Sequence, residues 1–384
     1  PELKKELYEA CRTIVEHEDA FIDLAFEMGP MEGLTAQEVK DYIRFIANRR
    51  LSQLGLEPIY KVDKNPLIRV FGEDVAQKGG VYHVTAELYK QFGVRRVFNS
   101  PLDETSIIGF GLGLGHNGFV PIPEIQFLAY LHNAEDQLRG EAATLPFFSE
   151  GRFTNPMVLR IPGLAYQKGF GGHFHNDNSL TIFRDIPGII LAVPSNGADA
   201  VKMLRTSVKE AYENGRVVVF IEPIALYMMK DLHEEKDGKW TYQYPSLEEE
   251  ISLGDFAVYG RGNSLAILTY GNGFYLSMKA KKIIESKLRK KIKVIDLRWL
   301  SPIDTSCLMK SIGNCKNILI VDECRKTGCH GEEIFLKISQ ASNNNLNIKL
   351  HAAEDSFIPL GISATSTLPS VESIANSALA LFNE

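Results

Sequence analysis

Residues that could bind a flat ring gather between Val97 and Gln137. Glu104 lies between a Ser-Pro turn and a glycine-rich run, and Phe127 and Tyr130 follow further along the stretch. A carboxylate can hydrogen-bond a ring nitrogen, and aromatic side chains can stack on a ring face. The stretch therefore favours a site for a flat nitrogen heterocycle.

Each of these residues also has a purely structural explanation. Ser100, Asp103 and Glu104 all suit the start of a helix, where a carboxylate caps backbone N–H groups or interacts with the positive end of the helix dipole. Residue type alone favours this capping role for Glu104. Phe127 and Tyr130 equally suit packing in a hydrophobic core.

The elements that must position these residues follow a βα pattern from Ile68 onward. Short apolar runs alternate with amphipathic stretches, which is typical of an α/β fold with a largely parallel sheet. Strands are expected at residues 70–75, 96–99, 156–162, 188–193, 217–221, 264–271, 293–297 and 318–321. Helices are expected to end at Phe92 and to span 278–288, and the polar, acidic segment 228–252 predicts a linker between two domains.

Composition bounds the class of protein. With 384 residues, the chain is long enough for two or three domains, and a net charge of −6 gives no reason to expect a nucleic-acid partner. No apolar run approaches the roughly 20 residues that span a bilayer, and the charged start of the chain has no signal-peptide core. A metal site at Cys324 and Cys329-His330 would need a second ligand pair, which the sequence lacks. We therefore expect a cytoplasmic protein with reduced thiols, no membrane contact and no metal ligands of its own.

The glycine run before Phe127 could suggest a nucleotide site. Its members are Gly109, Gly111, Gly113 and Gly115. The spacing differs from the dinucleotide fingerprint, and no acidic residue follows in register to bind a ribose. Close packing of a helix is the better explanation. The sequence also has neither a phosphate loop ending in G-K-[ST] nor a hydrolase nucleophile elbow.

Several ordered motifs carry a family resemblance over residues 68–384. They are GEDVAQKGGVY, RVFNSPLDE, PIPEIQFLAY, GGHFHNDNS, PGIILAVPSNGADA, VFIEPIALY, VIDLRWLSPID, VDECRKTG and DSFIPLG. Together they resemble the beta subunit of the thiamin-dependent dehydrogenase component of 2-oxoacid dehydrogenase complexes. The resemblance implies a transketolase-like pyrimidine-binding domain at 68–252 and a transketolase-type C-terminal domain at 253–384.

The resemblance also assigns roles in binding thiamin diphosphate. Glu104 matches the catalytic acid that hydrogen-bonds the aminopyrimidine ring, and a carboxylate shielded from water would favour the imino tautomer of that ring. Tyr130 and Phe127 match aromatic residues that line the pyrimidine pocket. Glu124 is expected to support the same pocket.

His175 matches the active-site histidine of the family. This sequence reads His-Asn-Asp where the family has His-Ser-Gln, and the departure bears on contacts to substrate and acyl acceptor. A histidine on a glycine-rich loop can donate or accept a proton near neutral pH. The expected step is protonation of a lipoyl sulfur or stabilisation of the substrate. His173, two residues earlier, is the rival for this role.

The implied activity is oxidative decarboxylation of a 2-oxoacid, such as pyruvate or a branched-chain oxoacid, with acyl transfer to lipoamide. The family's Gly-Asp-Gly motif, which holds the diphosphate and magnesium, does not occur in this sequence. The resemblance therefore implies an alpha subunit that shares the site and holds most of the magnesium, together with beta–beta association in an α₂β₂-type assembly. It further implies a lipoyl-bearing acyltransferase partner and a structural potassium ion near the strand after Asn155.

The first 67 residues have a different origin. The stretch MEGLTAQEVKDYIRFIANRRLSQLGLEPIYKVDKNPL resembles the C-terminal helical part of the ribonucleotide reductase small subunit. That family's di-iron ligands and radical tyrosine lie on earlier helices and have no counterpart here, so a structural helical appendage is expected. Two other functions stay open. One is a non-catalytic fusion or scaffold whose site never assembles, and the other is a single-chain transketolase-like synthase, which the missing Gly-Asp-Gly motif disfavours.

Overall fold

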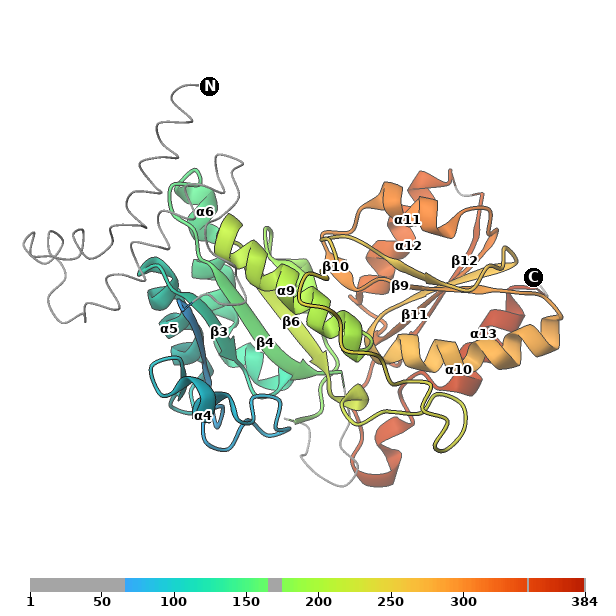
Figure 1. Ribbon diagram of the computed structural model, residues 1–384. Coiled ribbons are helices and arrows are strands. Elements are labelled where there is room, and N and C mark those ends of the chain that lie inside the picture. Colours follow the sequence, from blue (N-terminus) through green and yellow to red (C-terminus); the bar gives the residue numbers. More distant parts are fainter. Residues whose placement is uncertain (1–65, 165–174, 344, 383–384) are drawn as a thin grey trace, which may run out of the picture. The chain divides into compact units, whose positions relative to one another are not determined.

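A computed structural model describes residues 66–164, 175–343 and 345–382 (Figure 1). The chain forms two compact units, each built from separate stretches. The first unit takes the chain up to Glu124 together with Asp136–Leu159 and Ser207–Val218. The second takes Ile125–Glu135, Arg160–Thr206 and the chain from Val219 onward. The predicted helical segment at 1–67 lies almost entirely outside the described residues.

Seven strands form one sheet, in the order β10-β5-β6-β4-β3-β1-β2. They are β1 (Ile68–Gly72), β2 (Val97–Asn99), β3 (Val120–Glu124), β4 (Met157–Gly163), β5 (Ile190–Ala192), β6 (Val217–Pro223) and β10 (Trp299–Ser301). β1 pairs in parallel with β2 and β3, whereas β10 is antiparallel to β5. Every residue of β3, β4, β5 and β6 is buried, which explains their largely apolar sequences.

Short helical segments connect these strands. They are α4 (Leu88–Phe92), α5 (Glu104–His116), the 3₁₀-helix η2 (Leu128–Ala134), the π-helix η3 (Gln137–Ala142), α6 (Thr144–Phe148), α8 (Thr181–Arg184), α9 (Gly197–Asn214) and the 3₁₀-helix η4 (Ile224–Leu226). α5 begins at Asp103, whose carboxylate accepts a hydrogen bond from the Ser106 backbone N–H at 3.1 Å. The helix packs against β3.

Aromatic packing joins α5 to the sheet. The rings of Phe71 and Phe98 stack at 5.2 Å, and Phe110 of α5 meets Phe71 edge-on at 5.3 Å. Two of the four helix glycines permit a close approach. A Cβ at Gly111 would lie 3.0 Å from Met157 Sδ, and one at Gly115 would lie 3.1 Å from the Pro156 carbonyl oxygen. Close packing is thus confirmed for these two positions.

The other two glycines of the run do not fit that prediction. A Cβ at Gly109 or Gly113 would meet no atom of the described residues within 4 Å. Both positions lie on parts of the helix surface that no described neighbour covers closely. Close packing was therefore the wrong explanation for half of the run.

Five strands form the second sheet, in the order β12-β11-β8-β9-β7. They are β7 (Ala257–Tyr259), β8 (Leu265–Thr269), β9 (Lys293–Asp296), β11 (Asn317–Arg325) and β12 (Asn347–Ala353). Only β7 is antiparallel to its neighbour. The remaining helices are α10 (Gly271–Leu288), α11 (Thr305–Ile312), α12 (His330–Ala341), the 3₁₀-helix η5 (Gly361–Thr365) and α13 (Val371–Ala380).

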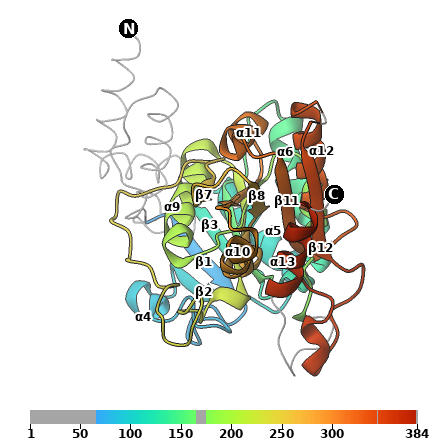
Figure 2. The same ribbon diagram turned by 90° about the vertical axis from the view of Figure 1, so that its right-hand side faces the viewer.

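Helices cover both faces of this second sheet. α10 and α13 lie side by side on one face, and α11 and α12 lie on the other (Figures 1 and 2). Side-chain caps start two of them. Asp304 accepts hydrogen bonds from the Ser306 and Cys307 N–H groups, and Ser370 forms a capping box with Ser373.

The predicted linker at 228–252 contains no helix or strand but is more than a polar spacer. Trp240 is buried with Phe274 and Tyr275 in the core cluster of the second unit. The Asp237 carboxylate accepts four backbone N–H bonds, from Leu232, His233, Glu234 and Lys239. The segment is therefore folded onto α10. Whether it also marks the domain boundary stays a prediction, as do the boundaries near 67 and 252.

The predicted strands and helix ends agree with the structure. All eight predicted strands match observed strands with small shifts at their ends, and the helices at Phe92 and Leu288 end as expected. β10 comes from the predicted C-terminal domain, so that part contributes to both sheets. The four cysteines in the described ranges are free thiols, as predicted.

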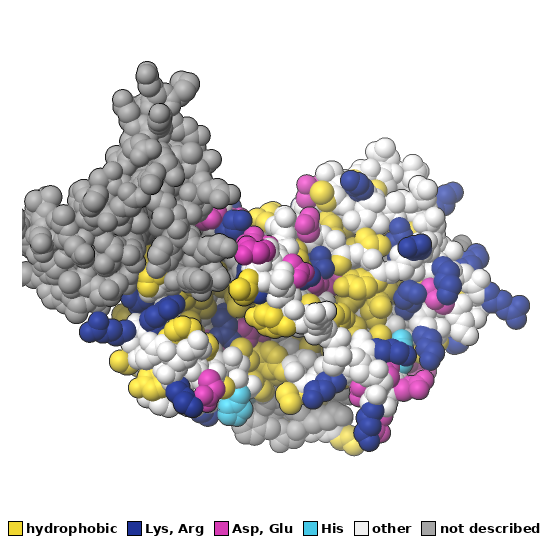
Figure 3. Space-filling model, in the orientation of Figure 1, with side chains coloured by type: hydrophobic (Ala, Val, Ile, Leu, Met, Phe, Trp, Pro, Cys, Tyr) yellow, Lys and Arg dark blue, Asp and Glu magenta, His cyan; other side chains and the backbone are white. Residues whose placement is uncertain are grey.

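Surface charge and hydropathy add two findings. On the face in Figure 3, lysine and arginine side chains are interspersed with aspartate and glutamate. Glu285, for example, pairs with both Lys281 and Lys291. Among the described helices, none is both long and apolar enough to cross a membrane.

Candidate active site

Three of the predicted site residues form one cluster. Phe127 precedes η2 and Tyr130 lies within it, so the two residues stand three apart on a 3₁₀ turn and their side chains share one side. His175 reaches this side from a later segment of the chain, beyond β4. Its Nε2 lies 3.0 Å from the Tyr130 hydroxyl, and its ring meets Phe127 edge-on at 4.8 Å.

This arrangement suits proton transfer at a partly shielded position. Phe127 is 3% exposed, whereas Tyr130 and His175 are half-buried. Burial alone would fit core packing for Phe127, but its ring also fixes the His175 imidazole from one side. The Tyr130 hydroxyl can donate to Nε2 or accept from it, depending on the imidazole tautomer. The cluster therefore holds a titratable ring between an apolar wall and a hydroxyl.

Glu104 belongs to the first compact unit, apart from this cluster, which belongs to the second. It is the first residue of α5 and is half-buried. Asp103, the preceding residue, makes the side-chain cap of this helix. The role of Glu104 in binding the cofactor stays a prediction.

A second acid near Glu104 escaped the sequence prediction. Burial, the Asp74 carboxylate and the Glu104 carboxylate raise the pKa of Glu73 above its usual 4.5. Glu73 follows β1, in the motif GEDV. Glu124 is 4% exposed at the end of β3, and a Cβ at Gly80 would lie 3.6 Å from its Oε1. The first unit therefore gathers acids at the ends of β1 and β3.

A second group that the prediction missed lies beside His175. Asp177 Oδ1 accepts a hydrogen bond from Arg325 Nη1 at 2.8 Å, and Asp177 Oδ2 lies 3.7 Å from His132 Nε2. Asp177 stands in GGHFHNDNS and Arg325 in VDECRKTG, so both belong to motifs that carry the family resemblance. The rival His173 lies outside the described residues.

Comparison with known proteins agrees with the fold. Models of the transketolase pyrimidine binding domain and the transketolase C-terminal domain match residues 46–229 and 254–358. The pyruvate dehydrogenase E1 component subunit beta of Bacillus subtilis (strain 168) is 32% identical over 325 residues, covering 83% of this chain and 93% of that protein. The chain belongs to this E1 beta family.

Further comparisons support this membership. The E1 component subunit beta of Staphylococcus aureus (strain Mu50 / ATCC 700699) is also 32% identical, over 84% of this chain and 94% of that protein. A solved split-gene transketolase, described as an inactive beta4 tetramer, has a TM-score of 0.64 at 16% identity. It covers 88% of this chain and 97% of that one, and it supports the fold alone.

The N-terminal segment differs from the rest of the E1 beta chain. The model of the ribonucleotide reductase small chain matches residues 1–66, which confirms the predicted resemblance. The described residues begin where that match ends. The expectation that this segment is a structural appendage stays a prediction.

The E1 family depends on thiamin diphosphate. In the first unit Glu104 places a half-buried carboxylate at a helix start, and in the second unit Tyr130, His175 and Phe127 place a hydroxyl, an imidazole and a phenyl ring in one cluster. A carboxylate and aromatic side chains are groups that can contact a ring such as that of the cofactor. In the described ranges, no three His, Cys, Asp or Glu side chains form a group that could hold a metal ion.

Proposed function

We propose that this chain is the beta subunit of a 2-oxoacid dehydrogenase that shares a thiamin diphosphate site with an alpha subunit. The reaction is oxidative decarboxylation of pyruvate or a branched-chain oxoacid, followed by acyl transfer to a lipoyl-bearing acyltransferase. The observation that carries the proposal is the contact of Tyr130 with His175 beside Phe127. It gives the chain a proton-transfer group in a family whose members are E1 beta subunits.

Each residue of the site has a separate task. Thiamin diphosphate, when bound, supplies the electron sink for decarboxylation. The Glu104 carboxylate would hold the ring end of the cofactor by accepting a hydrogen bond from a ring nitrogen. His175 donates a proton to the acyl acceptor from its imidazole, and Tyr130 orients that imidazole through Nε2. Phe127 and Tyr130 provide the apolar faces on which a ring can pack.

Other parts of the proposal concern assembly. Magnesium and the diphosphate are held mainly by the alpha subunit, and the beta subunit associates with a second copy of itself. A structural potassium ion near the strand after Asn155 is also part of the proposal. Asn155 is 2% exposed and its Oδ1 contacts His116 Nε2 at 2.6 Å. This contact does not test the potassium site, which stays a prediction.

Reconstitution tests the proposed function. The full chain is mixed with an alpha subunit, thiamin diphosphate and magnesium, and oxoacid-dependent reduction of an artificial electron acceptor is measured for pyruvate, 2-oxoisovalerate, 2-oxoglutarate and acetoin. Turnover is expected only on mixing. Glu104→Gln keeps the shape but weakens the ionic hydrogen bond, so kcat should fall by about two orders of magnitude or more.

Glu87→Gln is the matched control, because the Glu87 side chain is 76% exposed and pairs only with Lys90 at the surface. It should retain the activity of the unmodified chain. If the chain binds no thiamin diphosphate with any alpha subunit, a non-catalytic scaffold is favoured and the enzyme proposal is abandoned. Full activity of the Glu104→Gln chain would remove Glu104 from the mechanism.

A further inference from the structure

We propose that Asp177 and Arg325 form a clamp, together with His132, that positions His175, so that Asp177 orients the active site and does not contact the substrate. The clamp deepens the proposed function, since His175 is the proton-transfer group of that proposal. All four residues belong to the second compact unit. Asp177 is therefore a positioning residue.

The segment from His175 to Asp177 lies in register with η2. Tyr130 contacts His175, and His132 contacts Asp177. The contacts are two residues apart on both segments, so the loop carrying His175 lies along η2 and touches it at two successive points. A shift of Asp177 would therefore move His175 relative to Tyr130.

Both carboxylate oxygens of Asp177 contact a basic side chain. Oδ1 accepts from Arg325 Nη1 at 2.8 Å, and Oδ2 faces His132 Nε2 at 3.7 Å. The Asp177 side chain is only 14% exposed, and Arg325 is 30% exposed. A carboxylate that is held on both sides by side chains of the same chain has a structural role and does not need a ligand. The Asp at the third position of His-Asn-Asp is thereby explained as part of the clamp.

Arg325 extends from a buried strand of the second unit. It is the last residue of β11, and the seven residues between the ends of that strand are all buried. Its guanidinium also lies over the Phe357 ring, 5.9 Å from the centroid. Arg325 is therefore anchored in the core of the second unit and provides a fixed point for the loop.

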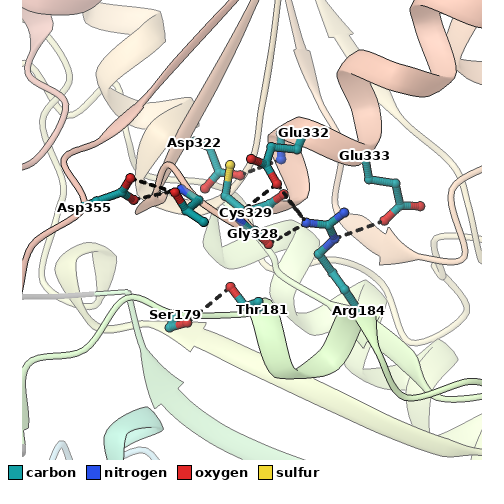
Figure 4. Close-up of polar contacts among 11 residues, drawn as sticks. Ser179, Thr181, Arg184, Asp322, Gly328, Cys329, Glu332, Glu333 and Asp355 are labelled. Carbon is teal, nitrogen blue, oxygen red and sulfur yellow. Dashed lines mark hydrogen bonds and ion pairs between the residues drawn. The ribbon is translucent and has the colours of Figure 1, made fainter.

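A second anchor lies at the end of α8, the helix that follows this segment. Arg184 Nη1 donates to the carbonyl oxygens of Gly328 and Cys329 at 2.6 and 2.8 Å (Figure 4). Gly328 has φ +82°, and a Cβ there would lie 2.9 Å from Thr181 Cγ2. Only glycine permits this approach. The connection between β11 and α12 thus holds the segment after His175 at Asp177 and again at Arg184.

The charges around the clamp support ionic contacts. Burial raises the pKa of Asp177, but the His132 side chain and the Arg325 charge outweigh it and leave the pKa below 3.8. The interaction with Asp177 raises the pKa of His132 above 6.5 against the effect of burial, and Glu135, 3.7 Å from His132 Nδ1, adds to the rise. The ion pair to Arg325 persists at neutral pH, whereas the His132 contact strengthens as pH falls.

The test measures the environment of His175 without relying on turnover. The full chain is treated with diethyl pyrocarbonate, and the rate of carbethoxylation of His175 is followed by peptide mass spectrometry, with the exposed His83 as internal reference. Asp177→Asn and Arg325→Gln should each raise the His175 rate severalfold. The double variant should add little to either single variant, because the two residues act through one contact. Arg325→Lys should restore part of the protection.

Kinetics of the reconstituted enzyme form the second arm. Asp177→Asn should lower kcat about tenfold with little change in KM, since a small misplacement of a catalytic group can cost up to about a hundredfold. Glu235→Gln, in a pair exposed by 86% and 87%, is the matched control and should change neither measurement. Unchanged carbethoxylation in Asp177→Asn would overturn the clamp.

Two further outcomes separate the clamp from the proposed function. A raised KM with unchanged kcat in Asp177→Asn would mean that Asp177 binds substrate, and this would also overturn the proposal. If the unmodified chain shows no turnover with any alpha subunit, the proposed function fails, and the carbethoxylation rates alone decide whether Asp177 and Arg325 hold His175.

Discussion

At the scale of single residues, the site depends on how one imidazole is held. His175 meets the Phe127 ring at 78° and the Tyr130 hydroxyl at 3.0 Å, so its ring is limited in both tilt and rotation. Phe127 and Tyr130 also meet each other edge-on at 5.5 Å. Three rings in mutual contact can keep a fixed geometry even on a loop. The Tyr130 hydroxyl is the only polar member besides His175 itself.

Tyr130→Phe tests the hydroxyl without removing the ring. The loss of the contact to His175 Nε2 should lower kcat about tenfold and shift the limb of the pH–rate profile that reports the imidazole. The free energy of unfolding should change by no more than about 1.5 kcal/mol, the net value of one hydrogen bond. Steady-state kinetics across pH and denaturant unfolding measure these effects.

Tyr244→Phe is the comparison for this variant, because Tyr244 is 71% exposed. It should leave kcat and the pH profile as they are. An unaltered pH profile in Tyr130→Phe would show that the hydroxyl does not orient His175, whatever its effect on stability.

At the scale of elements, the start of α5 carries two adjacent acids, and one of them is the cap of the helix. Asp103 has extended backbone geometry and accepts from the Ser106 N–H, as an N-cap residue does. Glu104 follows inside the helix. Asp103 therefore closes backbone hydrogen bonds at the helix start, and the role of the adjacent Glu104 in binding the cofactor stays a prediction.

Substitution at the cap should affect stability and not chemistry. Asp103→Ala removes the acceptor for the Ser106 N–H and should lower the free energy of unfolding by about 1 kcal/mol. Asp103→Asn keeps an oxygen at the cap and should be nearly neutral. Chemical denaturation of both variants, beside Glu104→Gln, checks this division. A loss of stability as large in Glu104→Gln as in Asp103→Ala would contradict it.

At the scale of the whole molecule, buried acids in the second unit make stability depend on pH. Asp296 is fully buried and accepts from Ser195 Oγ at 2.8 Å, and Glu323 is 2% exposed beside the Asn272 N–H. Burial raises the pKa of Asp296 to about 7 and that of Glu323 to about 8. Both acids are therefore protonated in the folded protein well above the pH at which they ionise in the unfolded chain.

This linkage has a defined sign. Between the unfolded values of 3.8 and 4.5 and the folded values near 7 and 8, the folded state binds more protons. The free energy of unfolding should then fall as pH rises through this window and level off above it. Asp296→Asn and Glu323→Gln should each flatten that fall.

Denaturant unfolding at pH 5 and pH 8 measures the effect. The exposed Glu87→Gln provides the comparison, since its loss should leave the pH dependence unchanged. A chain whose stability rises from pH 5 to pH 8 would show that Asp296 and Glu323 are ionised in the fold and that other groups govern its pH response.

Much of the architecture follows from local sequence. Largely apolar runs such as those of β4 and β6 are typical of strands buried on both faces. The ordered motifs also indicated the family, and with it Glu104, Phe127, Tyr130 and His175 as site residues. These inferences need only neighbouring residues and their order, which the sequence contains in full.

Other features required the tertiary structure. β10 is a three-residue strand whose partner β5 lies far away in the sequence, so no local pattern reveals it. Asp103 and Glu104 are adjacent acids at a helix start, and only the observed hydrogen bond assigns the cap to Asp103. Asp177 and Arg325 are 148 residues apart, and only folding brings their opposite charges to 2.8 Å. Sequence determines which groups are available, but long-range contacts decide which of them meet, because those contacts depend on how strands and loops pack.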